Sequence, residues 1–247
     1  LNAALNGAYD FVSTGTGMAT FSGAVGSHTA LNSLSVSGAA TLGNNISTAG
    51  GNVTFGGAVT LAGATSIATA GGMLTFSSPV NGPYDLTTNS GGGMTKFSKA
   101  VGGSSALGVL SVTGPATLAG NITTNNKAVA FNGPLTLGAT TVIATNGGAL
   151  YLGAVDGGYN LTTNSGGGMT TLSGDIGSAA ALNTISLNGP VTLGGNITTN
   201  NKTVTFGGDV TLARNALIAT NGAALTFSST VNGPYTLTTN SGGGTTK

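Results

Sequence analysis

The sequence repeats itself at a long and nearly fixed interval. A segment that begins at Tyr84 and reads Tyr-Asp-Leu-Thr-Thr-Asn-Ser-Gly-Gly-Gly returns at Tyr159 and Tyr235 with one substitution each, and a looser copy begins at Tyr9. The intervals between these four tyrosines are 75, 75 and 76 in the numbering. A regular period indicates a stack of similar structural units rather than one globular core.

A shorter period lies within the long one. A large apolar residue, three variable residues and a second apolar residue recur, as in Phe55 with Val59 or Phe131 with Leu135. The starts of these units follow one another at steps of about 15 to 21 positions, and they are Leu1, Phe21, Val36, Phe55, Phe76, Phe97, Val112, Phe131, Leu152, Leu172, Leu187, Phe206 and Phe227. We therefore expect about 13 coils with about 15–21 residues each, and four coils in each repeat of about 75–76 residues.

The domain organisation follows from the same period. The long repeats cover approximately 21–96, 97–171 and 172–247, and one coil over 1–20 precedes them. Both ends of the sequence coincide with expected coil boundaries. We expect residues 1–247 to form one continuous β-solenoid segment of a longer repetitive chain.

Within each unit the apolar side chains alternate with polar ones. Val53 and Phe55, and likewise Val204 and Phe206, have one residue between them. A period of two is typical of a strand with one buried face, and the Gly, Asn, Ser and Pro residues between the strands supply turns. Because one coil alone buries too little to offset its ordering entropy, the coils must stack. The expected fold is all-β, a parallel β-helix, or β-solenoid.

The composition narrows the range of functions. The chain has no Cys and no Glu, only 4% charged residues and a formal net charge of +1. So few charges give no electrostatic basis for binding nucleic acid or an anionic membrane. No apolar run approaches the length of roughly 18 residues that a membrane span needs, so we expect no membrane insertion of this segment. We also expect no cofactor and no metal.

Few residues are candidates for catalysis. His28 is the only histidine and has no matching partner in the other repeats, so we interpret it as an exposed loop residue. Asp175 and Asp209 each lie three residues after a coil start, and on coils two apart they would be about 10 Å from each other. That spacing leaves a polysaccharide-degrading enzyme as a remote alternative. The sequence otherwise predicts no catalytic residues, and Gly91–Gly93 is interpreted as a tight corner.

Outward polar residues recur in phase with the long repeat. They form a candidate polar ladder that consists of Thr87, Asn89, Thr162, Asn164, Thr238 and Asn240. Hydroxyl and amide groups aligned in this way could bind glycans or ice, which is the second function we consider. The alternative is that these residues only pair with one another along the stack.

The coils resemble those of a known family. Residues 196–212, which read Asn-Ile-Thr-Thr-Asn-Asn-Lys-Thr-Val-Thr-Phe-Gly-Gly-Asp-Val-Thr-Leu, and the segments 172–177 and 227–233 are similar to repeats of filamentous haemagglutinin-like bacterial exoproteins, which are giant adhesins. The resemblance covers the whole chain. It implies a right-handed β-helix, secretion across a bacterial outer membrane and a location on the cell surface.

These expectations together favour a structural protein over an enzyme. We expect an extracellular fibre or stalk that is stabilised by stacked coils and side-chain ladders, and that serves adhesion, biofilm formation or cell contact. Its expected partners are copies of itself, through end-to-end or lateral assembly, and glycans or other cell surfaces.

Overall fold

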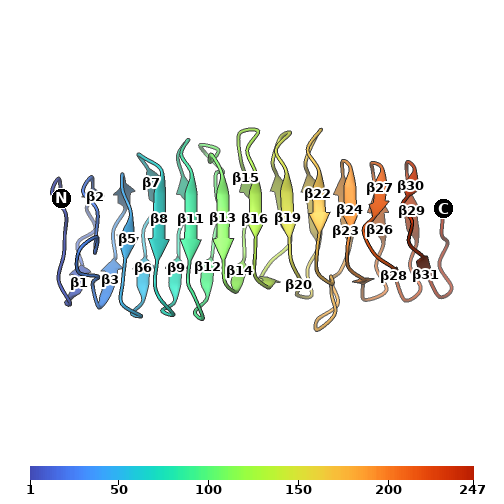
Figure 1. Cartoon of the computed structure of the whole chain (residues 1–247), viewed down its shortest axis with the longest axis horizontal. Helices are drawn as coiled ribbons and strands as arrows, with labels where there is room; N and C mark the ends of the chain where they lie inside the picture. Colours follow the sequence, from blue (N-terminus) through green and yellow to red (C-terminus); the bar gives the residue numbers. More distant parts are fainter. The chain divides into compact units, whose positions relative to one another are not determined.

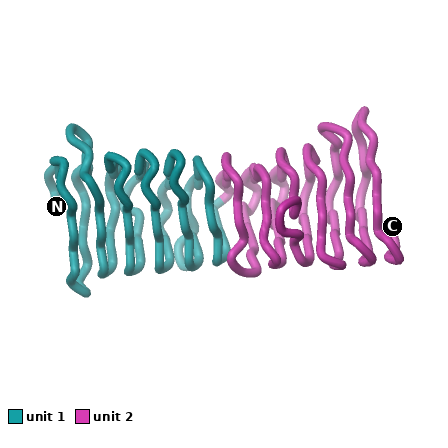
Figure 2. The backbone as a smooth tube through the Cα atoms, turned by 90° about the horizontal axis from the view of Figure 1, so that it is seen from below, with its two compact units in different colours: residues 1–125 teal, residues 126–247 magenta.

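The computed structural model describes all 247 residues and contains 31 β-strands and no helix (Figure 1). The chain divides into two compact units, Leu1–Asn125 and Asn126–Lys247 (Figure 2). In both units, strands far apart in the sequence pair in parallel, and three short strands follow one another around each turn. The predicted all-β stack of parallel coils is therefore confirmed.

Three parallel sheets form unit 1. The first sheet contains, in spatial order, β1 (Asp10–Ser13), β3 (Ser33–Val36), β6 (Val53–Phe55), β9 (Leu74–Phe76), β12 (Thr95–Phe97) and β14 (Ala116–Leu118). The second contains β2 (Ala19–Phe21), β4 (Ala40–Leu42), β7 (Val59–Leu61), β10 (Val80–Asn81) and, through a bridging residue at Val101, β15 (Ile122–Thr123). The third contains β5 (Ile46–Ser47), β8 (Thr65–Ala68), β11 (Leu86–Asn89) and β13 (Leu110–Thr113).

Unit 2 is built in the same way. Its first sheet contains β16 (Val129–Phe131), β19 (Leu150–Leu152), β22 (Thr170–Leu172), β24 (Val191–Leu193), β27 (Val210–Leu212) and β30 (Val231–Asn232). Its second contains β18 (Thr141–Ala144), β21 (Leu161–Asn164), β23 (Ile185–Asn188), β26 (Val204–Phe206) and β29 (Leu225–Phe227). Its third contains β17 (Leu135–Leu137), β20 (Val155–Asp156) and, through a bridging residue at Ile176, β25 (Ile197–Thr198), β28 (Ala216–Ala219) and β31 (Leu237–Asn240).

The strand register defines the length of one turn. Phe55 pairs with Phe76, which is 21 positions later, whereas Thr88 pairs with Val112, which is 24 positions later. The chain makes about 11 turns in total, so the expected number of 13 coils is not confirmed. The 15-residue step is wrong as a coil length, because Phe21 pairs with Leu42 and not with Val36. Each turn carries apolar residues in all three sheets, so matching by residue type alone aligned positions that belong to different sheets.

Aligned apolar ladders fill the interior of each unit. In a typical three-residue strand such as β6, the two flanking residues are buried and the central residue is directed outward. The rings of Phe55 and Phe76 stack in unit 1, with centroids 5.5 Å apart, and those of Phe206 and Phe227 stack in unit 2 at 4.9 Å. Burial of a Phe side chain stabilises a fold by roughly 1.5–3 kcal/mol, and adding coils repeats this gain.

The corners are closed by glycines and by buried hydroxyl groups. Gly91 has φ of 59°, and the hydroxyl of Ser90 donates a 2.8 Å hydrogen bond to the carbonyl oxygen of Gly93. A Cβ atom on Gly93 would lie 2.2 Å from the carbonyl oxygen of Gly72 in the preceding coil, so only glycine fits there. The interpretation of Gly91–Gly93 as a tight corner is confirmed.

The long sequence repeat does not contain a whole number of turns. In unit 1, Val25 and Val101 hold the same repeat position, yet Val25 bridges to β5 in the third sheet, whereas Val101 bridges β10 and β15 in the second. A repeat includes ten named strands and one bridging residue that takes the place of a strand, which makes eleven strand positions. Because each turn has three strand positions, one repeat covers three turns and two thirds. Each copy of the repeat in a unit is thus shifted by one sheet relative to the previous copy.

The other strands of both units follow the same shift. In unit 1, β4 lies in the second sheet and its equivalent β14 in the first, while β1 lies in the first and β11 in the third. In unit 2, β16 lies in the first sheet and β26 in the second, while β18 lies in the second and β28 in the third. Residues that match in sequence therefore do not stack on one another.

Candidate functional site

The predicted polar ladder is not formed by its six residues. Thr87 and Asn89 lie on β11, which pairs with β8 and β13. In unit 2, Thr162 and Asn164 lie in the second sheet, whereas Thr238 and Asn240 lie in the third. The prediction treated the sequence repeat as the stacking repeat, and the shift by one sheet separates the copies.

The side chains of the proposed ladder have local partners instead. The Oδ1 atom of Asn89 accepts a hydrogen bond from the backbone N–H of Gly91 at 3.0 Å, and Asn240 accepts one from Gly242 at 3.2 Å. The Asn164 Oδ1 atom accepts a hydrogen bond from Nδ2 of Asn188 at 2.8 Å. Three of the six residues therefore stabilise turns or neighbouring strands.

Hydroxyl columns do form on the outer surface, from other residues. In unit 1 they combine different repeat positions, as in the column that contains Thr20, Thr41 and Thr60. In unit 2, one column contains Thr171, Thr192 and Thr211. Because the strands of these columns have only three residues, each contributes one outward side chain, so the hydroxyls stand in single file.

Asp175 and Asp209 do not stack as the sequence predicted. Asp175 precedes Ile176, which bridges Val155 and Ile197 in the third sheet of unit 2. Asp209 precedes β27, which pairs with β24 and β30 in the first sheet. The two carboxylates belong to different sheets, because their shared coil position came from the 15-residue step. The paired arrangement that suggested an enzyme is absent.

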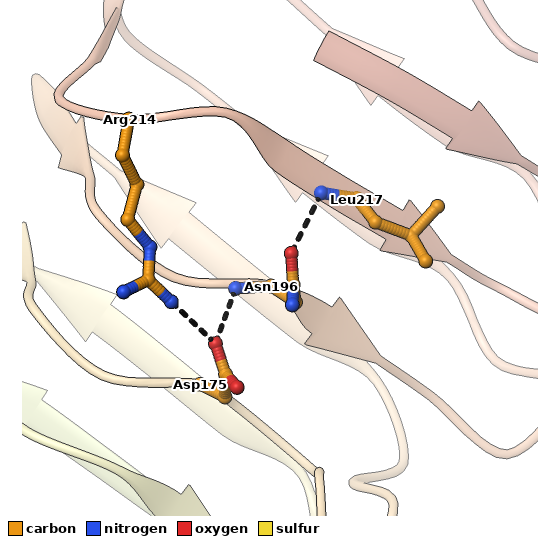
Figure 3. A network of polar contacts seen from close by, with 4 residues as sticks. All are labelled: Asp175, Asn196, Arg214 and Leu217. Atoms are coloured by element: carbon orange, nitrogen blue, oxygen red, sulfur yellow. Dashed lines mark hydrogen bonds and ion pairs between the residues drawn. The ribbon is translucent and has the colours of Figure 1, made fainter. Parts of the chain in front are cut away.

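Asp175 belongs to a surface network of its own (Figure 3). Its Oδ1 atom accepts a 2.9 Å hydrogen bond from Nη2 of Arg214 and a 2.8 Å bond from the backbone N–H of Asn196. The Oδ1 atom of Asn196 in turn accepts a 2.9 Å bond from the backbone N–H of Leu217 in the next coil. The Arg214 and Asp175 side chains are 52% and 37% exposed, so solvent screens the ion pair.

Asp209 is held by the coil that follows it. Its Oδ1 atom accepts hydrogen bonds from the hydroxyls of Ser229 and Thr230 and from the backbone N–H of Thr230. The Ser229 hydroxyl, followed by the two Thr230 donors, holds the pKa of the Asp209 carboxyl below its ordinary value, because these bonds favour the charged form.

The remaining ionisable candidates have structural surroundings. His28 is exposed in a loop, as expected, and its backbone N–H donates to Oδ1 of Asn6 at 2.9 Å. No group of three or more His, Cys, Asp and Glu residues is placed to hold a metal ion. The structure also contains no helix that is long and apolar enough to cross a membrane.

A shallow depression lies on the third sheet of unit 2, beside the Asp175 network. It has a volume of about 310 Å³ and is lined by Asn196, Asn215, Ala216, Leu217, Thr236 and Thr238. The Oδ1 atoms of Asn196 and Asn215 already accept backbone N–H groups, from Leu217 and Thr236. Of the predicted ladder, only Thr238 borders this depression.

One surface feature was not predicted from the sequence. Tyr9, Tyr84, Tyr159 and Tyr235, which mark the long period, are all exposed. A signal was available, since these positions hold four of the five tyrosines and lie in segments rich in Gly and Asn. No protein-family model, no curated protein and no solved structure matches this chain.

Proposed function

We propose that the chain is a non-enzymatic structural segment of an extracellular stalk or fibre that displays adhesive surfaces on a bacterial cell. Its role is mechanical: it holds attached parts of the protein at a distance and presents its own surface repeatedly. The right-handed coil belongs to this proposal, since parallel crossover connections are almost always right-handed. The expected four coils per long repeat are not part of the proposal, because the strand register gives three turns and two thirds per repeat.

The observation that carries the proposal is that all five aspartates form hydrogen bonds between successive coils. Each accepts a hydrogen bond from a residue 21 to 24 positions later, which lies in the next coil. Asp85, for example, accepts from the backbone N–H of Val109 at 2.7 Å, and Asp156 accepts from that of Ala179 at 2.8 Å. Catalytic carboxylates converge on one substrate atom, whereas these are distributed along the coils and support stacking.

Asparagine side chains extend this arrangement to other coils. The Oδ1 atom of Asn45 accepts a hydrogen bond from the backbone N–H of Ser66, and that of Asn52 accepts from Met73, both at 2.9 Å. These bonds supplement the backbone ladder between successive coils. A segment stabilised in this way resists extension along the stack, which is the property that a stalk requires.

Immunogold electron microscopy tests this location and role. Affinity-purified antibodies against residues 1–247 are applied to intact cells of the source and to permeabilised cells. The proposal predicts labelling of surface fibres on intact cells. Labelling confined to permeabilised cells would contradict it.

A further inference from the structure

Each long repeat places one tyrosine on a protruding corner. Tyr9, Tyr84, Tyr159 and Tyr235 have exposed fractions of 75%, 43%, 42% and 46%, and none of their hydroxyl groups is used in an internal hydrogen bond. Exposed aromatic rings lower the solubility of a protein, so four of them at equivalent positions indicate a contact surface.

The corners with a tyrosine are larger than the others because they contain two stacked loops. We define the tyrosine corners as residues 6–10 with 26–31, residues 81–85 with 102–107, and residues 156–160 with 177–182. Tyr235 lies in residues 232–236, which match the first loop of these corners. The longest turns include the second loop, such as the step from Thr88 to Val112 and the one from Thr163 to Leu187. Extra residues at these places produce the protrusions.

One side chain fixes the two loops of each corner to each other. In the second corner, Oδ1 of Asn81 accepts hydrogen bonds from the backbone N–H groups of Ser104 and Ser105, at 2.9 and 3.3 Å. The same bonds join Asn6 to the backbone of His28 and Thr29, and Asp156 to that of Ala179 and Ala180.

Backbone bonds add to this anchor. The N–H of Gly82 donates to the carbonyl oxygen of Ser105 at 3.2 Å, and that of Gly108 donates to the carbonyl oxygen of Tyr84 at 3.0 Å. Pro83 further restricts the backbone before Tyr84. The ring is thus presented from a fixed backbone, which reduces the entropy lost when a ligand binds.

The charge of the corners selects the class of ligand. Each corner contains one carboxylate, from Asp10, Asp85 and Asp156 respectively, and none contains Lys or Arg. Sulfated or sialylated groups would be repelled. A neutral ligand with both apolar faces and hydroxyl groups suits the combination of a Tyr ring with Ser, Gly and Asn, a composition that supplies rigid contact area and adaptable hydrogen bonds in other binding loops.

We infer that the tyrosine corners are repeated binding sites for a neutral oligosaccharide, whose sugar ring lies against the tyrosine ring. This inference rests on the proposed adhesive function and names its ligand class.

The sites are displayed in different directions, because the repeat shifts by one sheet. In unit 1, Tyr9 lies between the third and first sheets, whereas Tyr84 lies between the second and third, about 18 Å further along the stack. Sites that face different directions bind separate glycan chains around the stack, and avidity arises where a glycan layer reaches more than one of them.

A glycan array with neutral, sulfated and sialylated oligosaccharides tests the inference, followed by isothermal titration calorimetry with the neutral compound that binds best. The test variant combines Tyr9→Ala, Tyr84→Ala, Tyr159→Ala and Tyr235→Ala. The matched control is Tyr151→Ala, since Tyr151 is 47% exposed but lies in the middle of β19, away from any tyrosine corner. A fourfold Tyr→Phe variant retains the rings, and circular dichroism verifies that all variants fold.

The inference predicts binding of neutral oligosaccharides, a loss of about tenfold or more in affinity for the fourfold Ala variant, partial retention for the Phe variant and no change for Tyr151→Ala. It is overturned if no neutral oligosaccharide binds, if anionic glycans bind preferentially, or if Tyr151→Ala weakens binding equally. Absence of glycan binding together with surface labelling of intact cells would reject the binding sites and leave the stalk in place. Absence of surface labelling would reject the stalk itself.

Discussion

The rings of Phe76 and Phe97 lie parallel in neighbouring coils of unit 1, with centroids 5.2 Å apart and an angle of 2° between their planes. Phe76 also stacks on Phe55, so it has an aromatic neighbour on both sides. Its side chain is 1% exposed. The packing of the interior therefore depends on contacts between coils as much as on those within a coil.

Replacement of Phe76 by Ala should lower the free energy of unfolding by about 3–5 kcal/mol, because it removes a buried ring and leaves a cavity. Guanidinium denaturation followed by circular dichroism measures the loss, and hydrogen exchange should locate it in the neighbouring coils. The control is Met73→Ala, whose side chain is 45% exposed. Equal losses in the two variants would show that the ring stack contributes little.

Gly93→Ala should destabilise unit 1 by about 1–3 kcal/mol, because the added Cβ atom would meet backbone atoms that have no room to move. Gly92 provides the matched control, since a Cβ atom there would have no neighbour within 4 Å. Gly92→Ala should stay within about 0.5 kcal/mol of the parent. Thermal and guanidinium unfolding of the two variants decide the matter, and similar stabilities would contradict the close approach of the coils at Gly93.

Thr145→Val tests the buried hydroxyls of the corners in unit 2. The Thr145 side chain is fully buried, and its hydroxyl donates a 2.5 Å hydrogen bond to the carbonyl oxygen of Gly148. Its removal should cost about 1–3 kcal/mol, because the carbonyl group loses a donor. Thr211→Val, at an exposed outward position of β27, should change the stability by less than about 0.5 kcal/mol. An unchanged stability of the Thr145→Val variant would indicate that these corners are fixed by backbone hydrogen bonds alone.

Asp209 should make the stability of unit 2 depend on acidity. The folded-state pKa of Asp209 lies below the ordinary value of 3.8. Its contribution to the free energy of unfolding is therefore fully present above pH 3.8 and is lost as the pH falls through the lowered pKa. Asp209→Asn should abolish this part of the acid sensitivity. Ser229→Ala should raise the pKa toward its ordinary value, which NMR titration of the side-chain carboxyl carbon detects. An unchanged pKa in Ser229→Ala would reject the hydroxyl as the main cause.

The ion pair between Arg214 and Asp175 should contribute little. Since both side chains are substantially exposed, a double-mutant cycle with Arg214→Ala and Asp175→Ala should give a coupling energy below about 1 kcal/mol, and added salt should reduce it further. Asp175→Ala alone should cost more than Arg214→Ala, because the backbone N–H of Asn196 also loses its acceptor. The reverse order would contradict this assignment.

The fold could be predicted from the sequence because its strands and corners follow local rules. Alternation such as Val53-Thr54-Phe55 predicts a strand with one buried face, and Gly91–Gly93 predicts a corner; the structure confirms both. The coil boundaries could not be predicted in the same way. Apolar residues of the same type occur in all three sheets of a turn, so residue type does not reveal which sheet a strand belongs to.

The error in the coil boundaries also affected the candidate sites. Thr162 and Thr238 look equivalent in the sequence, but they lie in different sheets of unit 2, and the same holds for Asp175 and Asp209. A ladder requires neighbours in space, and only the strand register supplies them. The error affects the tyrosine corners less than the ladder. Each corner needs only two loops from successive coils, whereas a ladder needs matching residues along several coils.

Cryo-electron microscopy of the native assembly, isolated from the cell surface with antibodies against this chain, tests the central claim most directly. The proposed stalk predicts thin fibres in which stacked coils repeat at about 4.8 Å, with the density of this chain inside the fibre. Separate particles released from the cells, with no fibre and no repeat of this spacing, would contradict it.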